Sequence, residues 1–159
     1  MSFAQDLLEQ AEHLVNRESS NPKQASLRRA VSTAYYALFH LLIDEAVNNW
    51  GIARHRGKLA RTFDHGSMKR VSDEYVKNFY SGGKPASELL LKDVAQTFSE
   101  LQLKRHTADY DNSYIWTNAD AQYWIGRSGT AFDNWRVIRT QDEAQDFLLS
   151  LFLPKLPRQ

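Results

Sequence analysis

The sequence predicts an all-α fold, an antiparallel bundle of four to five helices with a short C-terminal helix. Apolar residues recur three and four positions apart over several long segments, which is the period of an amphipathic helix. No segment shows the sustained alternation of apolar and polar residues that indicates a half-buried strand. Connections between the helical segments are short, which favours antiparallel neighbours. We therefore expect residues 1–153 to form one domain, with residues 154–159 as a tail.

Composition excludes several classes of protein. The 159 residues include no cysteine, which rules out a disulfide, a thiolate zinc site and a cysteine nucleophile. The net charge of +1 argues against a strongly electrostatic nucleic-acid binder, although a local basic patch is compatible with it. No run approaches the ~18 apolar residues of a membrane span. The amphipathic, acidic N-terminus is unlike a signal peptide, so we expect a cytoplasmic protein without membrane association.

The first half of the chain predicts two long helices. Residues 3–17 place apolar side chains on one face, with Ser2 as a suitable N-cap. The second helix is expected from Pro22 or Lys23 to Asn49, and its middle is apolar on almost every side, which is typical of a central helix. Its small residues would let a neighbouring helix approach closely; they are Ala30, Ala34 and Ala37.

The next segment is basic. Residues 51–62 carry four Lys or Arg side chains and no acid, which indicates either a solvated loop with a first helical turn or a contact patch for phosphate or RNA. We expect a third helix over residues 57–80, in which Gly66 marks a kink or a break. Glycine and proline in residues 81–85 predict a loop.

The last third of the chain predicts three further helices. A fourth helix is expected over residues 86–111, followed by a surface loop over residues 112–118. Thr117 or Asn118 can cap a fifth helix that ends near residue 138. A short last helix over residues 141–152 is ended by Pro154.

A charged residue interrupts the apolar stripe of the fourth helix. Leu91, Val94, Phe98 and Leu101 are spaced three and four apart, and the same spacing continues to Arg105 and Ala108. An unpaired buried charge is costly, so Arg105 needs a partner or an aqueous cleft. Asp109, one turn further on, can supply that partner. The pattern therefore predicts a polar site at this point of the bundle.

Polar side chains on three helices are candidates for that site. The candidate ligand-binding residues are Arg29, Tyr36, Arg61, His65, Arg105, Asp109 and Tyr110, and the candidate catalytic residues are Arg105, His106 and His65. The cluster is either a hydrogen-bonded network that joins the helices or a cleft in which arginine and histidine meet a phosphate.

Neither a cofactor nor a metal is expected at this site. The chain has no GxGxxG or GxxxxGK[ST] sequence for a nucleotide phosphate, and no Glu-x-x-His pair for a di-iron site. A mononuclear site built from His40, His65 and His106 on three helices is the alternative left open.

Three segments together resemble the HEPN domain family, whose name stands for higher eukaryotes and prokaryotes nucleotide-binding. They are RRAVSTAYYALFHLL, DHGSMKRV and LKRHTADYD. The matching positions of the family pattern are Arg29, Tyr35, Tyr36, Ala37, Phe39, His65, Gly66, Arg105, Ala108, Asp109 and Tyr110. The resemblance covers residues 5–135 and implies a helical bundle that dimerises through the faces carrying its polar site.

The resemblance also bears on catalysis. Many members of this family are metal-independent RNases of toxin–antitoxin, abortive-infection or CRISPR systems, and they use Arg, four to six residues, then His. Arg61 and His65 have only three residues between them, and Arg105 has no histidine at that distance after it. This departure favours the branch of the family that resembles binding or regulatory modules, which often accompany a nucleotidyltransferase on a separate chain.

Three functions follow as hypotheses. The first is a HEPN-like module that binds RNA or a nucleotide, as one half of a toxin–antitoxin or defence pair. The second is a metal-independent RNase with a degenerate site, which would use Arg61 or Arg105 with His65 or His106. The third is a structural dimeric adaptor, in which the Arg105 cluster contributes only to stability.

Overall fold

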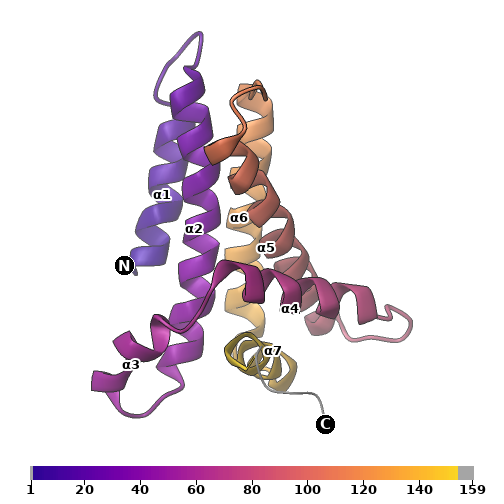
Figure 1. The fold of residues 1–159 in the computed structure, drawn as a ribbon. Coiled ribbons are helices and arrows are strands. Elements are labelled where there is room, and N and C mark those ends of the chain that lie inside the picture. The colour runs from indigo at the N-terminus through magenta and orange to yellow at the C-terminus, as the bar shows by residue number, and fades with distance from the viewer. Residues whose placement is uncertain (1, 154–159) are drawn as a thin grey trace.

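The computed structural model describes residues 2–153 and shows an all-helical bundle, which confirms the predicted fold class. The described part of the chain contains no strand, and its helices are α1 (Phe3–Val15), α2 (Gln24–Asn48), α3 (Ala53–Ala60), α4 (His65–Asn78), α5 (Ala86–Tyr110), α6 (Asn118–Ile138) and α7 (Asp142–Phe152). In Figure 1, α1, α2, α5 and α6 run along the bundle, α4 crosses it, and α3 and α7 lie at one end. Within residues 2–153 no helix is both long and apolar enough to cross a membrane.

Helix α2 lies at the centre of the bundle, as its apolar pattern predicts. Most of its side chains are buried, and α1, α5 and α6 pack around it. Ala30, Ala34 and Ala37 are all fully buried. The Ser128 hydroxyl of α6 donates to the Ala34 carbonyl at 3.0 Å, so the two backbones approach closely at this small-residue stripe.

Short polar residues cap the starts of α1 and α6. Ser2 caps α1 by accepting from the Gln5 amide at 3.2 Å, as expected. Thr117 caps α6 and, with Asp120, forms a reciprocal capping box. Helix α2 begins at Gln24, one residue after Lys23 and two after Pro22, the two expected starts: Lys23 occupies the N-cap position, and Pro22 lies outside the helix.

The predicted single helix over residues 57–80 is wrong. The chain forms two helices there, α3 and α4, and the break falls at residues 61–64 rather than at Gly66. Asp64 accounts for the break, because its backbone is extended and its carboxylate accepts from the Ser67 amide at 2.8 Å, which starts a new helix. Gly66 lies in the first turn of α4, and α3 has no buried side chain.

The connection between α5 and α6 is held against the start of α2. The Gln24 side-chain amide donates to the Trp116 carbonyl at 2.7 Å and accepts from its amide at 2.9 Å. Arg28 donates to the Asn112 side chain at 3.1 Å and to the Tyr114 carbonyl at 3.0 Å. The expectation of a purely surface loop is therefore incomplete, because Trp116 is buried in a small core cluster while Tyr114 stays exposed.

The described structure ends at Leu153, so the expected tail over residues 154–159 lies outside the described residues.

The buried apolar residues form a larger core cluster, which contains Trp135, and a smaller one, which contains Trp116. Trp124 packs against both clusters, so these tryptophans have a role in packing.

Candidate functional site

Arg105 lies on the inward face of α5, and its predicted burial is confirmed. The residue is 8% exposed, between the buried Leu101 and Ala108 on the same stripe. Its guanidinium carbon is 5.3 Å from the ring centroid of Tyr35 and 5.7 Å from that of Tyr36, both on α2. These distances are in the range of cation–π contacts, so the aromatic rings of α2 hold the charge at the junction of α2 and α5.

The charge of Arg105 is only partly compensated. Its Nη1 is 3.7 Å from Oδ2 of Asp109, a long ion pair to a carboxylate that is itself partly exposed. Its Nε is buried and has no hydrogen-bond partner. A buried donor without a partner costs about 1–3 kcal/mol, so the site has an unused hydrogen-bonding position at its cationic centre.

His65, the first residue of α4, reaches the same junction. Its Nδ1 is 2.8 Å from the Tyr35 hydroxyl, and its ring stacks on Phe39 with centroids 4.3 Å apart. Burial and the nearby positive charge of Arg105 lower the pKa of His65, against a smaller opposing effect of Asp64. The imidazole is therefore neutral at pH 7, where it can accept a proton.

The same burial acts on Tyr35. It raises the pKa of the phenol, although the charge of Arg105 opposes the shift, so the hydroxyl stays protonated and available as a hydrogen-bond donor. Tyr35 thus connects the two functional groups, because its ring contacts Arg105 and its hydroxyl contacts His65. We call Tyr35, Tyr36, His65, Arg105 and Asp109 the Arg105 cluster.

The Arg105 cluster reaches the molecular surface. Tyr36 and His65 are half-buried and Asp109 is exposed, while Tyr35 and Arg105 are buried beneath them. The arrangement presents a cation, a neutral imidazole and a phenol from three helices. Chemically it suits an anion with several acceptor oxygens, for which the guanidinium is the strongest available donor.

The structure does not bring all of the predicted residues together. Tyr36, His65, Arg105 and Asp109 meet, whereas Arg29 and Arg61 are exposed and make no hydrogen bond or ion pair with the Arg105 cluster. His106 follows Arg105 by one position and so lies about 100° around the helix. It is exposed and contacts the exposed Tyr110 ring, with centroids 4.9 Å apart.

Sequence reasoning omitted Tyr35 and Phe39 from the candidate site. Both belong to the apolar face of α2, so periodicity assigns them to the core. The sequence signal that could have identified them is their spacing of four residues, about one helical turn, with Tyr36 beside Tyr35.

His40, which follows Phe39, lies against the Phe3 and Phe39 rings, with centroids 4.9 and 5.4 Å away, and burial lowers its pKa.

The three-histidine alternative for a metal is not supported by the geometry. Among residues 2–153, no three His, Asp or Glu side chains gather closely enough to hold a metal ion. The His106 ring is exposed and contacts Tyr110, whereas the His65 ring contacts Tyr35, so His40, His65 and His106 do not form one site.

Comparisons of this chain with models of protein families, with curated proteins and with solved structures find no match.

Proposed function

We propose that this protein is a HEPN-like module that binds a phosphate group of RNA or of a nucleotide at the Arg105 cluster. The observation that carries the proposal is the buried guanidinium of Arg105, whose Nε lacks a hydrogen-bond partner and whose ion pair with Asp109 is long. A phosphate group bound by the guanidinium would compensate the charge that Asp109 leaves uncompensated. The half-buried Tyr36 ring offers a surface on which a base can stack.

Helix α3 supports the nucleic-acid form of this proposal. It carries Arg54, Arg56 and Lys58 and no acid, none of its side chains is buried, and Arg61 follows it. Arg56 donates to the Trp50 carbonyl at 2.9 Å, whereas Arg54 and Lys58 are exposed. Such a helix adds a sequence-independent attraction to a polyanion, which weakens as salt is added.

The wider setting follows from the same resemblance. We propose a cytoplasmic homodimer that pairs through the faces carrying the Arg105 cluster, with a nucleotidyltransferase or a toxin or antitoxin as a separate partner chain. Purification of the tagged chain, followed by mass analysis of co-purified protein and nucleotide, tests this part of the proposal.

Fluorescence anisotropy of a labelled single-stranded RNA tests binding directly. Arg105→Met is expected to weaken binding at least tenfold, because it removes the charge-assisted donor at the centre of the site. Arg136→Met is the matched control: it removes the same charge from an exposed side chain that pairs with Asp133. Affinity that is equal in the two variants would contradict the proposal.

A second function, metal-independent RNA cleavage, is favoured by one observation. His65 has a lowered pKa and is linked to Arg105 through Tyr35, so a neutral base and a cation share one site. In this function His65 would take the proton of a ribose 2′-hydroxyl as its oxygen attacks the adjacent phosphorus and the bond to the 5′-oxygen breaks. The leaving 5′-oxygen would take up a proton, and Arg105 would stabilise the phosphate throughout. Of the predicted pairings of Arg61 or Arg105 with His65 or His106, the pairing of Arg105 with His65 is supported by a shared contact, because both residues contact Tyr35.

Cleavage assays in EDTA separate binding from catalysis. If His65 is the base, His65→Asn abolishes cleavage while RNA affinity changes little, and His106→Asn has no effect. RNA that stays intact with the purified protein over hours rejects the RNase and leaves the binding module.

A further inference from the structure

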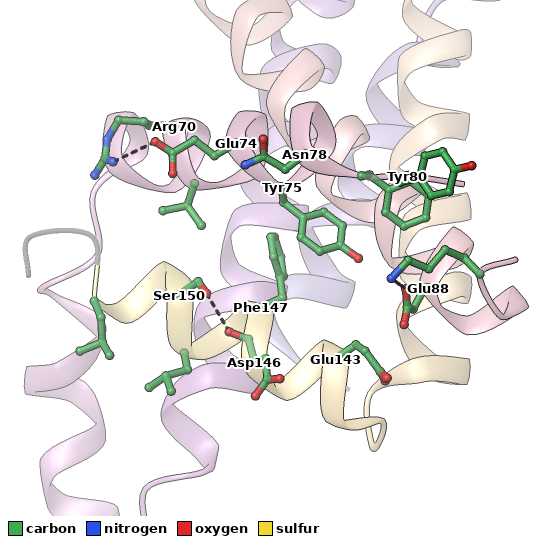
Figure 2. Close-up of a pocket in the computed structure, with 15 residues that line it drawn as sticks. Arg70, Glu74, Tyr75, Asn78, Tyr80, Glu88, Glu143, Asp146, Phe147 and Ser150 are labelled. Carbon is green, nitrogen blue, oxygen red and sulfur yellow. Dashed lines mark hydrogen bonds and ion pairs between the residues drawn. The ribbon is translucent and has the colours of Figure 1, made fainter. Parts of the chain in front are cut away.

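A groove separate from the Arg105 cluster lies between α4 and α7. It has a volume of about 770 Å³, and it shares no residue with the Arg105 cluster. In Figure 2, α4 forms one wall, α7 forms the other, and the loop that joins α4 to α5 closes one end. This volume lies in the range of sites that hold small organic molecules. We call it the α4–α7 groove.

Aromatic rings line the inner part of the groove. The Tyr75 ring meets Phe147 edge-on with centroids 5.5 Å apart, and it lies 6.0 Å from Phe79. The Lys92 ammonium already lies 5.6 Å from the Phe79 centroid, so this ring accepts a cation within the protein itself. Tyr80, at the rim, is 75% exposed and leaves a further aromatic face open.

Carboxylates from three helices surround these rings. Two of these carboxylates form ion pairs with residues four positions earlier in the chain. Glu74 pairs with Arg70 of the same helix at 3.6 Å, and Glu88 pairs with Lys84 of the preceding loop at 2.9 Å. Glu143 and Asp146 of α7 also line the groove, and within residues 2–153 neither has an ion-pair partner. The lining therefore has a formal charge of −2, from four carboxylates against Arg70 and Lys84.

The Tyr75 hydroxyl marks where the negative potential is concentrated. Figure 2 shows it directed between Glu88 of α5 and Glu143 of α7. Burial, then the charges of Glu88 and Glu143, raise the pKa of Tyr75 to about 12. The potential that opposes ionisation of the phenol attracts a cation to the same point.

We propose that the α4–α7 groove binds a linear aliphatic polyamine. One ammonium would lie between Glu88 and Glu143 beside the Tyr75 hydroxyl, and the methylenes would lie against Phe147 and Tyr80. Glu143 and Asp146 are three residues apart and so lie about one helical turn apart, a separation close to that of ammonium groups joined by three or four methylenes. The next ammonium would therefore meet Asp146.

The lining excludes the other ligand classes. An anion would be repelled by the net charge, and a neutral apolar molecule would desolvate carboxylates without pairing them. A bare metal ion would gain nothing from the aromatic rings, and no three carboxylates are close enough to ligate it within residues 2–153. An amine with an apolar chain uses both the rings and the carboxylates.

Calorimetric titration of the whole chain with spermidine at low salt tests the proposal. The doubly substituted Glu143→Gln, Asp146→Asn protein is expected to bind about five- to twentyfold more weakly, and Tyr80→Ala about two- to fivefold more weakly. Asp142→Asn is the matched control, because it removes a carboxylate from α7 outside the groove and should leave the affinity unchanged. Arg105→Met should also leave it unchanged, which separates this proposal from RNA binding.

Three results would overturn the polyamine site. They are the absence of binding at millimolar spermidine, an equal loss of affinity in Asp142→Asn and in the double variant, and Mg²⁺ binding that matches spermidine and weakens equally in the double variant. Octane-1,8-diol has the chain without the charges and should not bind; its binding as tightly as spermidine is a fourth result that would overturn the proposal.

Discussion

Replacing Arg105 by methionine is expected to change the free energy of unfolding by no more than about 1.5 kcal/mol in either direction. The substitution removes a 3.7 Å ion pair with a partly exposed carboxylate, worth about 0.5 kcal/mol, and cation–π contacts with Tyr35 and Tyr36, worth about 0.5–1 kcal/mol each. It also removes a buried Nε without a partner, which costs about 1–3 kcal/mol. Methionine has a similar length and leaves little cavity, so the opposing contributions nearly cancel.

Urea unfolding followed by circular dichroism at 222 nm measures this difference. For a domain of this size, 1 kcal/mol corresponds to a shift in Tm of about 2–4 °C. Arg105→Ala is the internal comparison: it removes the same charge but leaves a cavity, and should be less stable than Arg105→Met by about 1–3 kcal/mol. If Arg105→Met alone lost more than about 3 kcal/mol, the cluster would be a structural network and the adaptor hypothesis would be favoured.

Three further predictions concern stability. Burial lowers the pKa values of His40 and His65, so between those values and 6.5 the unfolded chain binds more protons. Urea unfolding should therefore show full stability above pH 6.5 and a fall below it, and a variant carrying His40→Gln and His65→Gln should show a smaller fall. Gln24→Ala removes both hydrogen bonds to the Trp116 backbone and should cost about 2 kcal/mol, or about 4–8 °C in a thermal melt; no change would mean that water replaces the amide. Ala34→Leu should destabilise by about 1–3 kcal/mol in urea, because its fully buried Cβ lies where α2 and α6 approach closely; a neutral effect would contradict that packing.

The long helices were predictable because each buries one continuous face. In α5, for example, Leu91, Val94, Phe98 and Leu101 are buried at the expected spacing. The break between α3 and α4 was missed because Leu59, Phe63, Val71 and Tyr75 contribute apolar contacts on both sides of it. Apolar spacing records burial but not continuity of the backbone. The local signal for the break was Asp64, a preferred N-cap residue that lies directly before α4.

Arg105 was predictable because a charged residue on an apolar stripe is visible along one helix. Its partners depend on which faces of different helices meet, and that information is not local. In the sequence, Tyr36 and His65 are candidates of the same standing as Arg29 and Arg61. The packing of the helices brings Tyr36 and His65 into contact and leaves Arg29 and Arg61 exposed. The α4–α7 groove shows the same limit more strongly, because Tyr75 and Glu143 are 68 positions apart and meet only in the folded chain.

The energetics of position 105 support a ligand site over a purely structural role. Leu101 precedes it and Ala108 follows it on the same buried stripe, so an apolar residue there would extend the core of α5. The chain instead carries a cation for which we expect the long ion pair and the aromatic contacts to offset the burial cost roughly, so that little net stability is gained. A charged residue at an apolar position that adds no stability to the fold is expected where the side chain must stay available for a ligand. Tyr36 and His65, which lie beside Arg105, are half-buried, so the Arg105 cluster extends from the buried guanidinium to the surface.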